Sequence, residues 1–586
     1  MHNTLPPIAV SAAILMAAVF AGASQAAAAN PPEPGQVPLT PAWALECWLW
    51  EDDDNNAEAL TELIEGFEEH DIPVRTVMID APWSMRFNDF EFDEERYPNA
   101  EAFIADLKER GYRVVVWMTS RINARNSGTR IQDSSDWYDE VRDKGYMVGD
   151  GLALPWWRGL GGFLDYTNPE AVEWWRDLQQ PLFDMGIDGW KLDGAAIHLS
   201  GLPVDQQRTH DGEPMSAREY MDLYYREEYR HGLTQNPEFI TLSRSFDTPN
   251  PYVMPEGFSP IDASPVNWVG DNRHTWDADN RGLPVAIDLI LRSAERGYNV
   301  VGSDVGGYHG GMPIPPELYI RWAQFSTFNG LFLNGGHGER RLWKRTDEEL
   351  EVIRKFSWLN TEIVPYVYSH VVEAHHGGPV LITRMIAVDE TPFHGVRQLD
   401  GTWRGHHPFD YMYGDSFFVA PIYEPGNERE VTLPVGEWRY LFDDHALIRG
   451  GRTITREFPI DEYPVFVRDG AIIPLNVERD YTGLGDADSA GYLTLALYPN
   501  GESAFTVHHP DNSGSWEVTM IEADDAVTVN FEGEGKPHLL RVFADSEPSA
   551  VEAGGEAFEG WEYDAEDKRL WVRNDDPDVA NYTLRF

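Results

Sequence analysis

The pattern of apolar and polar positions along the chain changes character once. Between about residues 44 and 336, short apolar runs of strand length alternate with longer amphipathic runs of helical period. Strands are predicted at 44–50, 75–80, 113–118, 186–193, 239–245, 266–272, 299–307 and 331–336, with helices such as 57–70, 99–110 and 284–296 between several of them. About eight such repeats predict an α/β fold, a (β/α)8 TIM barrel. A doubly wound sheet is the alternative, but the Gly-rich phosphate turn typical of it is missing near the first strand.

After about residue 378 the helical period disappears. Short runs of Val, Ile, Phe and Tyr recur between Pro, Gly, Asn and Asp turns, which is typical of all-β structure. A more polar segment near 478–489 predicts a break between two β modules. We therefore expect a (β/α)8 barrel over 42–377, a proximal β-sandwich over 378–477 and a distal β-sandwich over 478–586.

The first residues predict export. Residues 8–29 are apolar, then rich in alanine, and end in small residues suited to signal-peptidase cleavage. We expect a signal peptide over 1–29, a periplasmic or secreted protein and no transmembrane span after cleavage. The start of the chain has no Lys or Arg before the apolar run, so an uncleaved membrane anchor is the alternative. The Pro-rich stretch 30–41 predicts a linker.

The net charge of the chain limits the classes of binding partner that we expect. The chain has 586 residues, with 46 Lys and Arg against 98 Asp and Glu, and its formal net charge is −52. Such a surface repels nucleic acid and anionic membranes, so we expect neither as a partner. The run Asp52 to Asp54 lacks calcium-loop spacing and is interpreted as solvated, and Cys47 is interpreted as a buried thiol without a catalytic base beside it. We expect no metal and no organic cofactor.

Carboxylates end many of the predicted strands. In a barrel of this kind the working residues lie at the carboxyl ends of the strands, so these acids are expected to converge on one cleft. In GIDGWKLDG, residues 186–194, strand alternation puts Lys191 and Asp193 on one face. A buried structural salt bridge is the alternative there. The acids are Asp80, Asp165, Asp193, Asp271 and Asp304, and the tryptophans near the same ends are Trp83, Trp157, Trp190, Trp268 and Trp276. Aromatic faces with carboxylates between them suit sugars.

An ordered set of motifs is more specific. GWKLDG, SRS at 243–245, NWVGDN, GSDVGGY and a glycine-rich segment carrying His337 follow one another. Further along, YGDSFFVAPI, LPVGEW and YPVFVRDGAIIP occur in the β region. Over roughly residues 43–475 the chain resembles glycoside hydrolase family 31. The resemblance implies an exo-acting, retaining α-glycosidase for oligosaccharides, with Asp193 as nucleophile and Asp271 as general acid/base.

The resemblance also implies roles around this pair. Asp80, Arg244 and His337 are expected to bind hydroxyls of the sugar, Trp157 and Trp268 to form walls, and Asp304 to support the site. Lys191 is counted with the substrate-binding set and is expected to keep Asp193 ionised, whereas Asp271 needs a raised pKa. The alternative, purely structural interpretations are a helix cap for Asp80, a structural ion pair for Arg244 and core packing for the tryptophans.

Several questions stay open from the sequence. The family's usual N-terminal β-sandwich is not seen, and Gly194 to Ala196 stand where many members have a glutamate. Glucosides, xylosides, galactosides and sulfoquinovosides are all candidate substrates, and an anionic one would need cations such as Arg121, Arg125, Arg158 or Arg273. Transglycosylation, elimination by a lyase and an inactive carbohydrate-binding barrel are the alternative functions. The oligomeric state stays unknown.

Overall fold

The computed structural model describes residues 31–248, 256–385 and 409–586. The predicted signal peptide lies outside these ranges. Within them, none of the helices is both long enough and apolar enough to cross a bilayer.

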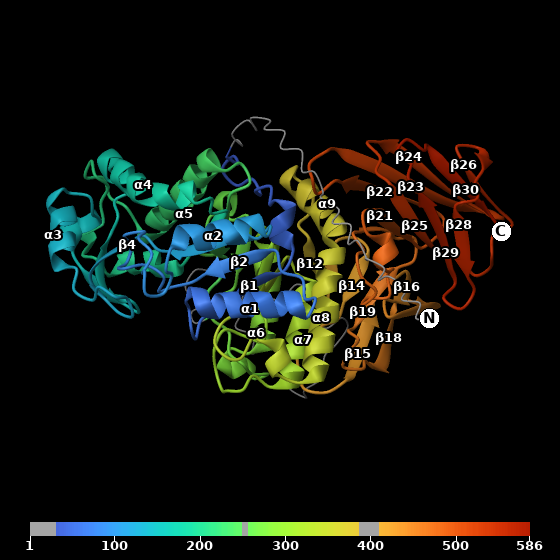
Figure 1. Ribbon diagram of the computed structural model, residues 1–586, viewed down its shortest axis with the longest axis horizontal. Helices are drawn as coiled ribbons and strands as arrows, with labels where there is room; N and C mark the ends of the chain where they lie inside the picture. The colour runs from blue at the N-terminus through green and yellow to red at the C-terminus, as the bar shows by residue number, and fades with distance from the viewer. Residues whose placement is uncertain (1–30, 249–255, 386–408) are drawn as a thin grey trace, which may run out of the picture.

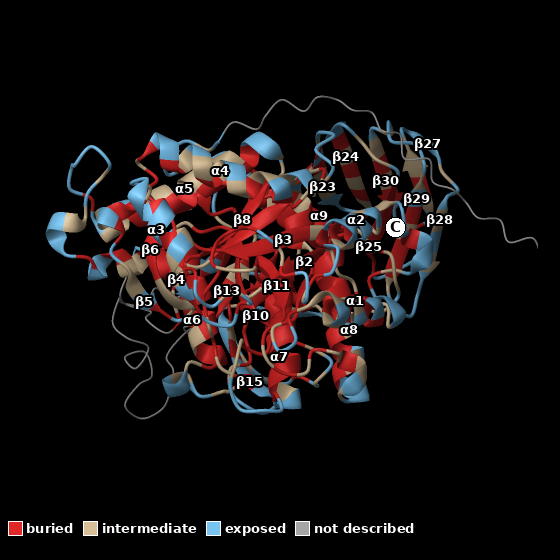
Figure 2. Cartoon of the chain, turned by 60° about the vertical axis from the view of Figure 1, so that its left-hand side comes forward, coloured by how far each residue is buried: buried red, intermediate tan, exposed pale blue. Residues whose placement is uncertain are grey.

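Eight parallel strands close into a barrel in the centre of the molecule (Figure 1), which confirms the predicted TIM barrel. Their order around the barrel is β1-β11-β10-β9-β8-β7-β3-β2. The strands are β1 (Trp48–Trp50), β2 (Thr76–Ile79), β3 (Arg113–Met118), β7 (Gly189–Leu192), β8 (Ile240–Arg244), β9 (Val266–Trp268), β10 (Val301–Asp304) and β11 (Leu331–Asn334). Nearly all their residues are buried (Figure 2), because helices cover the outside and side chains fill the inside.

The helices surround this barrel with their apolar faces inward. In α1, Leu60, Leu63, Ile64 and Phe67 are buried at helical spacing, and the Asn56 side chain caps the helix by accepting from the Ala59 amide at 3.0 Å. The helices of the barrel region are α1 (Ala57–Glu69), α2 (Ala100–Glu109), α4 (Pro169–Asp184), α5 (Ala217–Gln235), α6 (Leu283–Glu295), α7 (Pro316–Thr327), α8 (Asp347–Glu362) and α9 (Val364–His375).

The first predicted strand is shorter than expected. Residues 42–45 form a 3-10 turn after Pro41, and only Trp48–Trp50 joins the barrel. Both parts are almost wholly buried, so apolar character alone did not separate them. The predicted linker packs against the barrel where it is described, since the Thr40 hydroxyl donates to the Pro265 carbonyl at 2.5 Å.

A small subdomain leaves the barrel after β3. It contains β4 (Arg121–Asn126), α3 (Ser135–Asp143), β5 (Leu154–Trp156) and β6 (Gly159–Phe163), and the strands form an antiparallel sheet in the order β4-β6-β5. None of these three strands is among those predicted from the sequence. Gly159 allows the close pairing, because a Cβ there would lie 2.0 Å from the Arg125 carbonyl oxygen.

Two all-β regions follow the barrel, at the orange and red end of Figure 1. The first has a six-stranded sheet, β12-β13-β14-β19-β16-β17, and the pair β15-β18; its strands are β12 (Ile382–Arg384), β13 (Tyr411–Tyr413), β14 (Phe417–Val419), β15 (Glu428–Leu433), β16 (Glu437–Tyr440), β17 (Asp443–Arg449), β18 (Arg452–Glu457) and β19 (Val465–Arg468).

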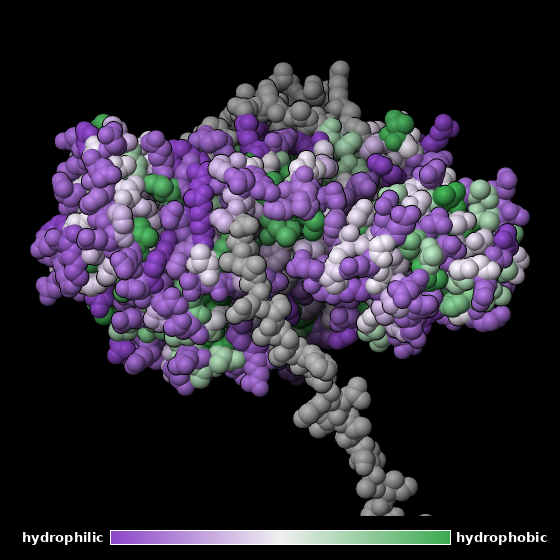
Figure 3. All heavy atoms as spheres, turned by 90° about the horizontal axis from the view of Figure 1, so that it is seen from above, coloured by the Kyte–Doolittle hydropathy of each residue, from purple (hydrophilic) through white to green (hydrophobic). Residues whose placement is uncertain are grey.

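The second region has two sheets, β20-β21-β25-β29-β28 and β22-β23-β24-β30-β26-β27. Its strands are β20 (Ile472–Leu475), β21 (Leu493–Leu497), β22 (Glu502–His508), β23 (Ser515–Ala523), β24 (Ala526–Gly533), β25 (His538–Phe543), β26 (Ala550–Ala553), β27 (Glu556–Ala557), β28 (Trp561–Asp564), β29 (Arg569–Asn574) and β30 (Asn581–Arg585). Because β20 pairs with β21, this sheet takes in residues that the sequence analysis had placed before its boundary at 478. The face seen in Figure 3 is mostly hydrophilic, as the charge of the chain leads one to expect.

Candidate active site

A pocket of about 560 Å³ opens at the carboxyl ends of the barrel strands. Each of the eight strands supplies lining residues, either from its last positions or from the loop that follows it. The nine residues that were assigned a role in the site from the sequence all line this pocket: Asp80, Trp157, Lys191, Asp193, Arg244, Trp268, Asp271, Asp304 and His337. Of the five strand-end acids predicted to converge, four line the pocket: Asp80, Asp193, Asp271 and Asp304.

Arg244 holds the two central carboxylates together. Its Nη2 donates to Asp193 Oδ1 at 2.8 Å and to Asp271 Oδ1 at 3.4 Å, while Nη1 donates to Asp247 at 2.6 Å. Since Asp193 and Asp271 share one nitrogen, these two oxygens are no farther apart than the sum of the two distances, about 6.2 Å. The pair differs in exposure, because the Asp193 side chain is 13% exposed and that of Asp271 is 38% exposed.

Asp193 lies in surroundings that keep it ionised. Burial raises its pKa, but the charges of Arg244 and Lys191 and hydrogen bonds from the Gly194 amide and the Trp117 indole outweigh burial and hold the pKa below its usual value. The hydrogen bond from the Gly194 amide measures 2.7 Å, and that from the Trp117 indole measures 3.2 Å. Asp193 follows β7 directly, so Lys191 and Asp193 both face the pocket, while Trp190 packs behind the barrel against Phe183.

Lys191 forms the floor with Asp80. Its Nζ lies 2.5 Å from Asp80 Oδ2, and both side chains are 8% exposed. The same ammonium lies over the rings of Trp50 and Trp268, at 4.5 and 5.0 Å. Burial lowers the pKa of Lys191, but the charges of Asp80, Asp304 and Asp193 outweigh it and raise the pKa. Lys191 therefore carries the positive charge that its acidic neighbours require.

Asp304 is a buried carboxyl on the same floor. Burial, opposed by the charge of Lys191, raises its pKa to about 7. Its Oδ1 has no hydrogen-bond partner among the described residues. The chain turns sharply after it, with Gly306 at φ 82° and Gly307 at φ 89°, and the Gly307 amide donates back to the Asp304 carbonyl.

His337 lies in the wall after β11, between two carboxylates. Its Nε2 lies 2.9 Å from Asp52 Oδ2 and its Nδ1 2.6 Å from Asp53 Oδ1. The hydrogen bond to Asp52 and the charges of both acids outweigh partial burial and raise the pKa of His337 to about 9. The Asp52 side chain is only 5% exposed and lines the pocket, so its interpretation as part of a solvated run was wrong.

The mouth of the pocket is aromatic. Trp157, on the turn between β5 and β6, is 49% exposed and meets the His198 ring edge-on at 5.8 Å. Arg158 follows it and donates to the Ala81 carbonyl at 2.9 Å. Exposure thus falls from Trp157 and Asp271 at the mouth to Lys191, Asp80 and Trp268 inside.

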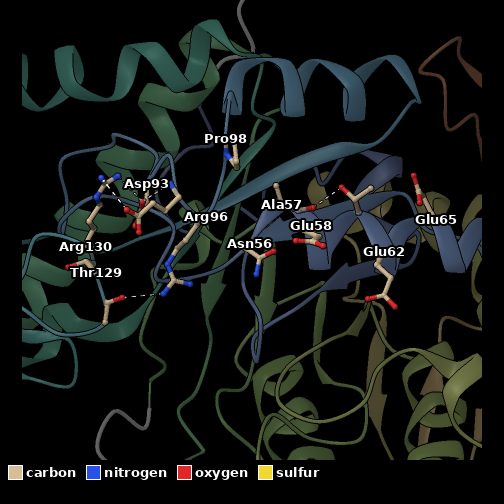
Figure 4. A pocket seen from close by; sticks show the side chains of 13 residues that line it. Asn56, Ala57, Glu58, Glu62, Glu65, Asp93, Arg96, Pro98, Thr129 and Arg130 are labelled. Carbon is tan, nitrogen blue, oxygen red and sulfur yellow. Dashed lines mark hydrogen bonds and ion pairs between the residues drawn. The ribbon is translucent and has the colours of Figure 1, made fainter.

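A second and larger hollow, of about 890 Å³, lies against α1 (Figure 4). Arg130 approaches Asp93 across it, and the Arg96 guanidinium donates to the Gly128 carbonyl. The residues that line it include acids and arginines but neither an aromatic side chain nor any of the predicted site residues. Volume alone would favour this hollow as the functional site. The aromatic side chains and the predicted site residues favour the strand-end pocket instead. In the described part of the chain, no group of three or more His, Cys, Asp or Glu is arranged to hold a metal ion.

Comparison with known families shows to which family the chain belongs. The family model described as glycosyl hydrolases family 31 TIM-barrel domain matches residues 37–370, and that of the family 31 C-terminal domain matches residues 403–473. The first match alone covers more than half of the chain. The chain belongs to glycosyl hydrolase family 31. This confirms the resemblance seen in the motifs.

Two relatives in family 31 are about a quarter identical to the chain over the residues that align. Alpha-xylosidase XylQ of Lactiplantibacillus pentosus is 26% identical over 85% of this chain and 63% of its own length. Alpha-glucosidase 2 of Bacillus thermoamyloliquefaciens is 25% identical over 87% and 64%. The chain thus spans less than two thirds of either relative. A solved family 31 dextranase of Flavobacterium johnsoniae, complexed with glucose, has the same fold, with a TM-score of 0.77 at 20% identity over 94% of this chain and 72% of that one.

Not every residue marked from the sequence lies at the family 31 pocket. Asp165 does not line it and instead accepts hydrogen bonds from the Thr167 amide and hydroxyl just before α4. Trp83, Trp190 and Trp276 do not line it either. Residues that no sequence pattern marked as part of the site also line the pocket, among them Asp52, Trp117, Asp247 and Tyr308.

Proposed function

We propose that this protein is a retaining α-glycosidase that removes terminal sugars from oligosaccharides. The observation that carries the proposal is the shared hydrogen bonding of Asp193 and Asp271 to one nitrogen of Arg244, which limits the separation of two carboxylate oxygens to about 6.2 Å. Retaining glycosidases use carboxyl groups about 5 to 5.5 Å apart, whereas inverting enzymes need about 6.5 to 9.5 Å to admit a water.

The two carboxylates differ in the way that a double displacement requires. Asp193 is buried, and its pKa is held low, so it is ionised and suited to attack the anomeric carbon. Asp271 is more exposed and has the longer contact with Arg244, so a bound sugar can approach it from the mouth. In the first step the Asp193 carboxylate attacks the anomeric carbon, the glycosidic bond breaks and the proton of Asp271 passes to the leaving oxygen. In the second, Asp271 takes a proton from a water that attacks the same carbon and displaces Asp193 as a carboxylate.

The shape of the pocket favours attack at chain ends. Its floor consists of Lys191, Asp80 and Trp268, all buried, whereas Trp157 stands exposed at the mouth. A terminal sugar would reach the floor, where Asp80 and Lys191 offer hydrogen bonds, and the next unit would stack near Trp157. The α configuration is supported by the named activities of the two relatives. Arg244 contributes mainly by positioning both carboxylates, since its guanidinium pairs with Asp193, Asp247 and Asp271 and lies over the Trp268 ring.

The test is a screen of aryl α-glycosides with the first-formed sugar followed by NMR. Hydrolysis of an α-glycoside that gives the α anomer first supports the proposal, and the same spectra report any transfer of sugar to a second sugar. A first-formed β anomer contradicts retention. Export, predicted from residues 8–29, is a separate proposal.

A further inference from the structure

One side of the pocket is lined from the acidic loop after β1, which the sequence did not mark as part of the site. Glu51 organises this loop, because its Oε1 accepts from the Asp53 amide at 2.9 Å and the Asp54 amide at 3.4 Å. As a result Asp52 turns into the pocket, with a side chain 5% exposed, while Asp53 stays 45% exposed outside the lining.

The imidazole of His337 is fully engaged by these two acids. Each ring nitrogen faces a carboxylate oxygen within hydrogen-bond distance, so both nitrogens donate and the ring carries a positive charge. The Gly338 amide also donates to Asp53, at 2.8 Å, which fixes that side of the arrangement. No nitrogen of His337 is left to bond a sugar hydroxyl while these contacts hold.

Asp52 is the group on this wall that is free to accept such a bond. Burial raises its pKa, but hydrogen bonds from His337 and Tyr308 and the charges of His337 and Lys191 outweigh burial and hold the pKa below its usual value. It is therefore ionised, and an ionised carboxylate, with about four acceptor positions, has more than the contacts with His337 and Tyr308 use. Tyr308 is itself held in place by stacking on Trp50, with ring centroids 5.9 Å apart and planes 9° apart.

We propose that Asp52 contacts the sugar being cleaved by accepting a hydrogen bond from one of its hydroxyls, and that His337 acts on substrate only by positioning Asp52. This rests on the proposed glycosidase function and names its substrate class: a neutral sugar with a free hydroxyl on this side. A substrate with a carboxylate or sulfate group at this position would be repelled, because Asp52 and Asp80 are both acidic.

The experiment uses the full chain and a set of aryl α-glycosides that each lack one hydroxyl. Asp52→Asn keeps the shape but removes the charge, and it should lower kcat/KM by about 10- to 100-fold on the parent sugar, the cost of a hydrogen bond to a charged group. On the one deoxy sugar that lacks the contacted hydroxyl, Asp52→Asn should equal the unchanged enzyme within about three-fold, because nothing remains to be lost.

The matched control is Asp53→Asn, which removes a carboxylate from the same imidazole outside the pocket. It should lower kcat/KM by a small factor that is the same for every deoxy sugar. His337→Gln should reproduce the hydroxyl pattern of Asp52→Asn in weaker form, which a purely structural role would not do. If Asp52→Asn does not fold, Asp52→Ser, which is smaller and also neutral, serves in its place.

The outcomes separate two failures. If the unchanged enzyme hydrolyses none of the glycosides, the proposed function is wrong. If it hydrolyses them and the Asp52 variants lose the same factor on every sugar, or nothing on any, then Asp52 does not contact a hydroxyl and the inference is overturned.

Discussion

The strand-end pocket and the hollow beside α1 are both large and acidic, yet their charges are arranged differently. In the pocket, Arg244 and Lys191 are buried, and so are their partners Asp193 and Asp80. In the hollow, Arg130 and Glu95 are paired at 3.2 Å with side chains 42% and 73% exposed. Charges in water interact weakly, whereas charges withdrawn from water shift each other's pKa and attract polar ligands strongly. Burial of paired charges, rather than volume, distinguishes the site.

The largest effect is expected from Asp193→Ala. Loss of the nucleophile should lower kcat/KM for α-glycosides by about 10⁴-fold or more, as loss of a covalent catalyst does elsewhere. Steady-state kinetics with a natural disaccharide and with an aryl glycoside would measure this. Near-normal turnover by the folded variant would show that Asp193 is not the nucleophile.

Asp271→Ala should come next, and its effect should depend on the leaving group. General acid catalysis contributes about 10²- to 10⁴-fold, and a leaving group that needs no proton does not use it. We therefore expect a large loss on disaccharides and a clearly smaller one on a dinitrophenyl glycoside. An equal loss on both substrates would argue against Asp271 as the acid.

Arg244→Gln should change the pH profile as well as the rate. Arg244 lowers the pKa of Asp193, so its removal raises that pKa, and the acidic limb of kcat/KM moves to higher pH. We expect about a 10²-fold loss at the optimum, because both carboxylates also lose their common anchor. An acidic limb that stays in place would contradict the electrostatic role.

The smallest effects are expected in the hollow. Glu62→Gln removes an exposed carboxylate that pairs with Lys344 at 2.6 Å and Arg341 at 3.1 Å. Exposed pairs contribute little, so this variant and Arg130→Gln should retain kcat/KM within about two-fold and unfold at nearly the same temperature. A loss of ten-fold or more in either would mean that the hollow takes part in the reaction.

Local patterns predicted the barrel and most of its pocket. Strand alternation in GWKLDG predicted that Lys191 and Asp193 lie on the same face. Because barrel enzymes carry their functional residues at the carboxyl ends of the strands, the same sequence predicted that Asp80, Asp271 and Asp304 belong to the site. These inferences needed only the order of residues within one strand.

The remaining features depend on contacts between distant parts of the chain. Asp52 looked solvated because three acids in a row usually are, and only the return of the loop onto His337 buries it. Trp117 sits in an apolar run that has no sign of function, and the glycines of β6 carry no periodic signal that would reveal the sheet β4-β6-β5.

The most direct measurement is to trap the sugar on the protein. The enzyme is mixed with a fluorinated α-glycosyl fluoride, whose intermediate breaks down slowly, then digested, and the peptides are analysed by mass spectrometry. The account predicts one added sugar, as an ester on Asp193. Turnover without an added sugar, or a sugar on another carboxylate, would contradict it.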